Sequence, residues 1–125
     1  MNAHNISTDS APLLSIQNIA CQYGTQSIVH DFNLSIQRGD ICCLLGPSGC
    51  GKTTVLRAIA GFHPIHHGRI ELDRHCISTE THTLAPEQRN IGMVFQDYAL
   101  FPHLSVCENI TYGLKGMTAD AKESI

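Results

Sequence analysis

A glycine-rich run that contains one lysine and several hydroxyl side chains is the part of this sequence best suited to chemistry. The run consists of Gly46, Pro47, Ser48, Gly49, Cys50, Gly51, Lys52, Thr53 and Thr54. It matches G-x-x-x-x-G-K-[ST], in which the backbone N–H groups of a loop surround a phosphate. Lys52 supplies a full positive charge, and the Thr53 hydroxyl is suited to bind Mg²⁺. The run predicts a loop that binds the phosphates of a nucleoside triphosphate.

The segments on both sides of the run have the pattern that such a loop needs. The apolar residues Ile41–Leu45 predict a fully buried strand leading in. Residues Thr53–Ala60 predict a helix leading out, and Gly61 is suited to end it. The N-terminus of that helix adds partial positive charge at the phosphates. A chance glycine-rich turn before a helix is the alternative, and the strand–loop–helix context disfavours it.

Length and charge exclude several classes of protein. The chain has 125 residues, a formal net charge of -3 and 15% charged residues. One small domain is expected, and the absence of a basic surface argues against a nucleic-acid partner. No apolar run approaches the ~20 residues of a membrane span. Residues 1–11 lack the pattern of a secretory signal, so we expect a flexible tail there and a cytoplasmic chain.

Cysteine and histidine usage leaves a metal site open. The six cysteines include no C-x-x-C pair, which favours reduced thiols packed as small hydrophobic groups. His63, His66 and His67 form a cluster in which a metal site is conceivable. Pro64 and Gly68 favour a solvated turn instead.

Alternation of apolar and polar residues predicts strands on either side of the glycine-rich run. The segments concerned are 13–19, 32–36 and 68–72. A turn is expected at Tyr23-Gly24 and another at 38–40. Residues 73–89 are expected to form a surface loop with a short turn at Pro86. Residues 91–95 predict a second buried strand.

The C-terminal part of the chain carries a helix signal. Ser105 and Glu108 have the spacing of a capping box, which predicts a helix to about Leu114 that ends at Gly116. Thr118 is suited to cap a further helix.

From about Leu13 onward the chain resembles the first half of an ABC-transporter ATPase subunit of the importer type. Residues Leu44–Thr54 are close to the Walker A segment of that family, and Ala60–Phe62 follow as in the family. The residues 91–104, IGMVFQDYALFPHL, resemble its Q-loop region, and 108–110 and 112–114 match the segment that follows. The sequence of these segments is most similar to that of ferric-iron import ATPases, although the ATPases of sugar, polyamine and sulfate importers share many of the same residues.

The resemblance implies an α/β fold: a P-loop NTPase core with an N-terminal antiparallel β-subdomain, truncated before the helical subdomain and the Walker B strand. Residues 12–125 would form a partial nucleotide-binding domain that uses ATP and Mg²⁺. By resemblance, Tyr23 stacks on adenine, and Gln96 contacts Mg²⁺ and the attacking water. Residues Gln96–Pro102 would face the membrane permease. A second ATPase subunit completes the family's dimer, which lies on the inner face of the membrane.

The family motifs that carry out hydrolysis do not occur in the sequence. It contains no LSGGQ signature, no Walker B aspartate, no catalytic glutamate and no switch histidine. Whether this chain is an enzyme is therefore left open, and a truncated nucleotide-binding remnant is one alternative. A different P-loop enzyme is another. A GTPase needs an N-K-x-D motif, which does not occur in the sequence. A small kinase needs a substrate-binding region with arginines, of which the chain has few.

Overall fold

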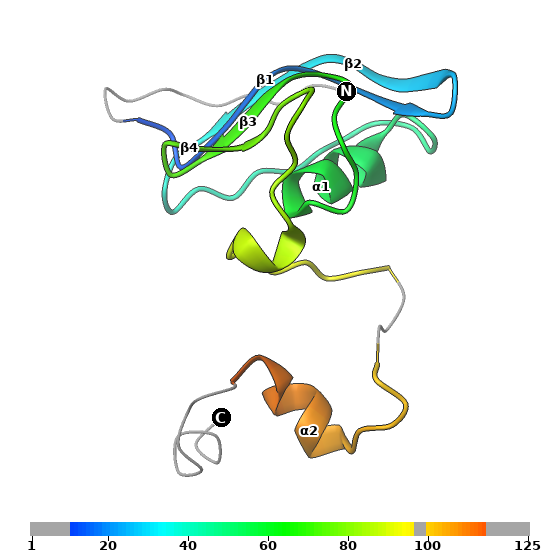
Figure 1. The fold of residues 1–125 in the computed structure, drawn as a ribbon, viewed down its shortest axis with the longest axis vertical. Helices are drawn as coiled ribbons and strands as arrows, with labels where there is room; N and C mark the ends of the chain where they lie inside the picture. Colours follow the sequence, from blue (N-terminus) through cyan, green and yellow to red (C-terminus); the bar gives the residue numbers. More distant parts are fainter. Residues whose placement is uncertain (1–10, 97–99, 115–125) are drawn as a thin grey trace. The chain divides into compact units, whose positions relative to one another are not determined.

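The computed structural model describes residues 11–96 and 100–114. The chain divides into two compact units, Met1–Met93 and Val94–Ile125, and each is described by itself (Figure 1). The first unit contains the strands β1 (Leu14–Tyr23), β2 (Gln26–Ile36), β3 (His67–Leu72) and β4 (His75–Ser78), the helix α1 (Lys52–Ala60) and the 3-10 helix η1 (Pro86–Gln88). The second contains the helix α2 (Val106–Thr111) and the 3-10 helix η2 (Tyr112–Leu114). The tail expected at 1–11 lies, except for Ala11, outside the described residues.

The four strands form one antiparallel sheet in the order β2-β1-β3-β4. The central strand β1 pairs with β2 on one side and with β3 on the other, so that Leu14 lies between Ile36 and Leu72. Helix α1 covers one face of the sheet (Figure 1). The predicted antiparallel β-subdomain and the α/β class are confirmed.

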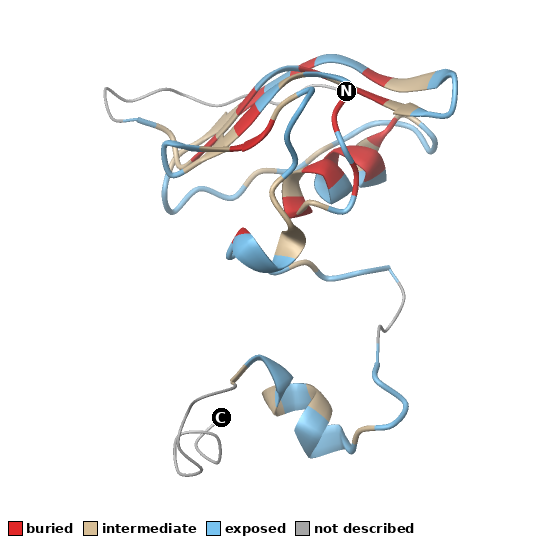
Figure 2. Ribbon diagram, viewed as in Figure 1, coloured by how far each residue is buried: buried red, intermediate tan, exposed pale blue. Residues whose placement is uncertain are grey.

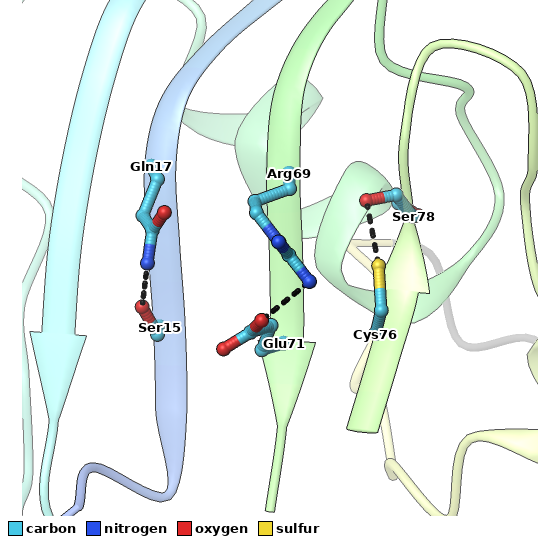
Figure 3. A network of polar contacts seen from close by, with 6 residues as sticks. All are labelled: Ser15, Gln17, Arg69, Glu71, Cys76 and Ser78. Carbon is cyan, nitrogen blue, oxygen red and sulfur yellow. Dashed lines mark hydrogen bonds and ion pairs between the residues drawn. The ribbon is translucent and has the colours of Figure 1, made fainter. Parts of the chain in front are cut away.

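The two faces of the sheet differ as the alternation of residues predicts. Ile16 and Ile70 are partners across β1 and β3, and both are buried in the core beneath α1. Figure 2 shows buried residues gathered on the strands and on α1. The opposite face is polar, with Gln17 donating to Ser15 at 3.2 Å and an ion pair between Arg69 and Glu71 at 2.6 Å (Figure 3). Solvent therefore reaches one face only.

Irregularities in β1 and β2 change which residues face the core. Asn18 in β1 and Asp31 in β2 have positive φ angles of 50° and 43°. The register of β1 shifts between Ile16 and Ile19 toward β2 and between Gln17 and Ala20 toward β3. An extra residue in a strand reverses the alternation beyond it and bends the strand. Both strands therefore continue past the predicted segments as a bent hairpin, with Ile19 buried again.

Glycine is required where β3 crosses this irregularity. Gly68 has a φ of 87°, and a Cβ there would lie 2.4 Å from the carbonyl oxygen of Gln17. The close approach of the two backbones leaves no room for a side chain.

The prediction of a buried strand at Ile41–Leu45 is wrong. Within this run, Leu45 forms an isolated β-bridge and the other four residues belong to no strand. Ile41 is 95% exposed. Cys42 and Leu44 pack against the core while the alternate residues face solvent. An apolar run of this kind needs strands on both edges, and the described sheet does not extend to it.

The segments after β3 also differ from expectation. No strand forms at 91–95, where Val94 is 98% exposed. Residues 73–89 are not simply a surface loop, because they include β4, with Ile77 and Ser78 buried. Asp73 and Arg74 join β3 to β4 with φ angles of 48° and 67°, as in a tight two-residue hairpin. The expected turn at Pro86 is present as η1.

In the second unit the predicted capping box is confirmed. The Ser105 side chain accepts from the Glu108 N–H at 3.1 Å, and the Glu108 carboxylate accepts from the Ser105 N–H at 2.7 Å. Helix α2 is shorter than expected, because the chain continues as η2 from Tyr112. The predicted end at Gly116 and the helix at Thr118 lie outside the described residues.

Candidate functional site

The glycine-rich run forms a loop directly before α1, as predicted. Gly51 caps the helix with a φ of 101°, and the first N–H groups of α1 have no side-chain cap. The loop is closed on itself, since the Cys50 N–H donates to the Pro47 carbonyl at 3.3 Å. No acidic residue lies in the first turn of α1. The uncapped N–H groups and the positive end of the helix therefore remain available to an anion.

Packing against β2 fixes the position of the loop. A Cβ on Gly51 would lie 2.8 Å from a methyl group of Val29 and 3.3 Å from the Ile28 carbonyl oxygen. Only glycine fits at this point, both because of the φ angle and because of the contact. The strand thus positions the loop, and the loop positions the first turn of α1.

Lys52 places its ammonium group within the loop. Its Nζ donates to the Gly46 carbonyl and, at 3.0 Å, to the Pro47 carbonyl. The side chain is only partly buried. A cation held on carbonyl groups at the mouth of a glycine-rich loop can exchange those acceptors for phosphate oxygens, which bind it more strongly.

An open pocket lies at the same place. It has a volume of ≈ 390 Å³ and is lined by Ile28, Ser48, Gly49, Gly51, Lys52, Thr53 and Thr54. Thr53 is exposed in the first turn of α1, whereas Thr54 is buried. The exposed hydroxyl of Thr53 is an oxygen ligand of the kind that Mg²⁺ accepts. The donor set therefore fits the phosphates of a nucleotide and a magnesium ion.

Tyr23 lies at the end of β1, beside the turn that leads to β2. Its ring is 4.7 Å from that of His63, tilted by 46°, and its hydroxyl is 3.5 Å from Nη1 of Arg57 on α1. Tyr23 is not one of the described residues that line the pocket at Lys52. Its side chain is 46% exposed, so stacking on adenine stays a prediction.

Gln96 belongs to the second unit and is exposed. Its predicted contacts with Mg²⁺ and water stay a prediction. In the segment that follows, Leu100 is 69% exposed and Phe101 40% exposed. Residues 97–99 lie outside the described part. The exposed apolar side chains are those that the sequence predicted for a permease contact, which itself stays a prediction.

The histidine cluster does not form one group. His63 is buried against Tyr23, while His67 pairs with Glu80 at 2.6 Å. Among the residues that the structure describes, no group of three or more His, Cys, Asp or Glu side chains is placed to hold a metal ion. The burial of His63 differs from the solvated turn that the sequence suggested.

Comparison with known proteins decides the family. Residues 29–125 match the family described as ABC transporter. The chain belongs to the ABC transporter family. It is 47% identical over 117 residues to "Fe(3+) ions import ATP-binding protein FbpC 2" of Haemophilus influenzae. It is 48% identical over 104 residues to "Spermidine/putrescine import ATP-binding protein PotA" of Hahella chejuensis.

The chain spans about a third of the length of these ABC transporter relatives. The alignment with the Haemophilus protein covers 91% of this chain and 33% of that protein. The alignment with the Hahella protein covers 83% of this chain and 27% of that protein. Membership of the ABC transporter family is therefore established over most of the chain, and the activity of a whole relative is a separate question. Among the described residues, no helix has the length and apolarity that crossing a membrane requires.

Sequence reasoning missed Arg89, which is among the most buried side chains described, at 2% exposure. Its guanidinium donates to carbonyl groups at the end of α1 and on β4. Burial lowers the pKa of Arg89 from its ordinary value. A single arginine in a polar stretch gives no periodic signal. The only general signal is that the last carbonyl groups of every helix lack a partner within the helix and need a donor from elsewhere.

Proposed function

We propose that this chain is the ATP-binding portion of the ATPase subunit of a binding-protein-dependent ABC importer. The observation that supports the proposal most is the loop at Gly46–Thr54, with its uncapped helix N-terminus and the Lys52 ammonium at its mouth. Such a site binds phosphate groups through backbone N–H groups and one fixed charge. Membership of the ABC transporter family makes ATP, with Mg²⁺, the expected ligand.

The residues of this chain have separate tasks in the proposed complex. Lys52 neutralises charge on the terminal phosphates, and Thr53 contributes an oxygen to Mg²⁺. Tyr23 offers an aromatic face for adenine, a contact worth about 1–3 kcal/mol by analogy with base stacking. Gln96 supplies an amide that can bind Mg²⁺ and orient water. In this proposal the chain supplies the ATP-binding half of the ATPase site. The alternative function is that of a remnant that binds nucleotide without hydrolysing it.

Replacing Lys52 tests the proposal directly. The Lys52→Ala chain should lose most of its affinity for MgATP, because the triphosphate loses its nearest fixed positive charge. Thr53→Ala should weaken binding of MgATP more than binding of ATP in EDTA, which isolates the magnesium contact. Both are measured by titration with a fluorescent ATP analogue, with circular dichroism as the control for folding. Equal affinity of Lys52→Ala and the parent for MgATP would remove the phosphate site.

The transported substrate is proposed to be ferric iron, with polyamines, sugars or sulfate as alternatives. Relatives that import Fe(3+) ions and relatives that import spermidine/putrescine match at similar identity, 47% and 48%. The preference for iron therefore rests on the amino-acid sequence of residues 91–104, which resembles that of ferric-iron import ATPases. Growth of a deletion strain on limiting iron, compared with limiting polyamine, tests it: a defect in the polyamine medium alone would reverse the assignment.

Two protein partners complete the proposal. The segment Gln96–Pro102, in which Gln96 and residues 100–102 are described and exposed, is proposed to contact a membrane permease, which would hold the chain at the cytoplasmic face of the membrane. In a full-length subunit a second ATPase copy is expected. Crosslinking from Cys residues introduced at Leu100 and, as a matched control, at exposed Thr81 should capture the permease from the first position only.

A further inference from the structure

Arg89 has every hydrogen-bonding group of its guanidinium occupied. Nε donates to Leu84 at 2.8 Å; Nη1 donates to the carbonyls of Ala58 and Ile59, both at 3.1 Å. Nη2 donates to the Ile77 carbonyl at 3.0 Å and to the Ser78 hydroxyl at 2.8 Å. A side chain with five fixed contacts has one position only.

The acceptors come from three separate parts of the first unit. Ala58 and Ile59 lie in the last turn of α1, Ile77 and Ser78 lie on β4, and Leu84 lies on the segment before η1. Arg89 therefore ties the C-terminal end of α1 to the edge of the sheet. Gly61 allows this close approach, since a Cβ there would lie 2.7 Å from Nε of Arg89.

The charge of Arg89 is balanced without a carboxylate. All five acceptors are carbonyl or hydroxyl oxygens, and the ion pairs found among the described residues do not include Arg89. A cation at the C-terminus of a helix interacts favourably with the helix dipole. The five acceptors require the planar guanidinium group with its five N–H donors. The ammonium group of a lysine could donate to only some of these acceptors.

Helix α1 is thus held at both ends by contacts that exclude a side chain. Gly51 lies against Val29 at the N-terminal end, and Gly61 lies against Arg89 at the C-terminal end. The helix has nine residues, a length of about 14 Å. A rigid rod of this length that is released at its C-terminal end pivots about the end that Val29 still holds, so the direction of its first turn changes. That first turn carries Lys52 and Thr53.

We propose that Arg89 is a positioning residue for the phosphate-binding loop. By fixing the C-terminal end of α1 against β4, it sets the direction in which the first turn of that helix meets MgATP. The inference rests on the proposed ATP-binding function and extends it to a residue that does not touch the nucleotide. Fixed geometry of this kind determines how much of the available binding free energy is realised.

The test compares variants of the full chain. Arg89→Met removes the fork, Arg89→Lys keeps the charge, and Ser78→Ala removes one acceptor. Leu14→Ala is the control: this buried side chain lies between Ile36 and Leu72 at an end of the sheet. The dissociation constant for MgATP is titrated at a temperature at which circular dichroism shows each variant to be folded, and the melting temperature is recorded separately.

A positioning role predicts a change in affinity beyond any change in stability. Arg89→Met should raise the dissociation constant about tenfold, Arg89→Lys should lie between it and the parent, and Ser78→Ala should raise it about twofold. Leu14→Ala should lower the melting temperature and leave the affinity unchanged. An unchanged affinity in folded Arg89→Met, or an equal loss in Leu14→Ala, would overturn the proposal.

Two further outcomes are decisive. If Arg89→Met does not fold, Ser78→Ala decides, and parent-like affinity in that variant overturns the inference. Suppose that the parent binds MgATP, that Lys52→Ala does not, and that the Arg89 variants bind it as well as the parent. Then the proposed function stands and only this inference fails. If the parent does not bind MgATP, the proposed function fails, and the positioning role fails with it.

Discussion

Two cations lie at opposite ends of α1, and their surroundings give them different tasks. Lys52 is partly exposed, with its ammonium on two loop carbonyls that a ligand can replace. Arg89 is buried, with five contacts that belong to the fold. The sequence motif identified Lys52 because its spacing to the glycines is fixed by chemistry. Arg89 was not predicted, because its acceptors come from segments whose approach only the fold determines.

A third residue whose surroundings matter is Cys21. It is fully buried in β1, and burial raises the pKa of its thiol from 9.0 to about 11. The folded state therefore favours the neutral thiol. A group whose pKa is higher in the folded state stabilises the fold below its unfolded pKa and loses that effect as the pH rises.

The expected consequence is a loss of stability in alkali. Between pH 9.0 and about 11, the free energy of unfolding should fall by about 2 kcal/mol through Cys21 alone. Urea denaturation at a series of pH values measures this. Cys21→Val, which keeps a small apolar side chain, should show a smaller decrease over the same range. The same slope in both proteins would assign the decrease to other groups.

At the scale of the elements, the sequence predicted correctly those features that depend on neighbouring residues alone. Helix α1, its end at Gly61 and the capping box at Ser105 follow from propensity and capping. The runs 41–45 and 91–95 were predicted as buried strands because they are apolar, yet the described residues include no sheet that surrounds them. Strand β4 was missed because its turn, Asp73-Arg74, lacks the glycine that usually marks such hairpins.

The capping box of α2 makes a separate prediction. The N–H and hydroxyl of Ser105 lower the pKa of Glu108 below 4.5. Because the folded pKa of Glu108 is lowered, its carboxylate stabilises the cap at pH values above the ordinary glutamate pKa. This stabilisation is lost as the pH falls through the lowered pKa. The helical signal of α2 should therefore persist at pH 4.5 and decrease only in stronger acid.

Carboxyl chemical shifts of Glu108 measure this by NMR titration. Ser105→Ala, which removes the hydroxyl donor but keeps the N–H, should move the midpoint upward toward the ordinary glutamate value. A midpoint for Glu108 that is the same in both proteins would show that the hydroxyl does not act on it.

At the scale of the whole molecule, the sheet buries one face against α1, whereas several large apolar side chains elsewhere are exposed. Ile41, Leu45 and Val94 are 95%, 74% and 98% exposed. The chain spans about a third of the length of its relatives. These side chains are what a longer ABC ATPase chain, or a second molecule, would have to cover, because extended apolar segments with open edges associate readily.

The chain by itself should therefore be weakly stable and should self-associate. Replacing Ile41 and Leu45 together by lysine should reduce association, because these side chains face solvent while Cys42 and Leu44 keep their contacts with the core. Thr81→Lys with His82→Lys adds the same charge at exposed polar positions and should have little effect. Sedimentation velocity over a range of concentrations measures association, and calorimetry measures unfolding. A monomeric parent with a cooperative transition above about 60 °C would contradict the prediction and indicate that the exposed run is tolerated by an independently stable domain.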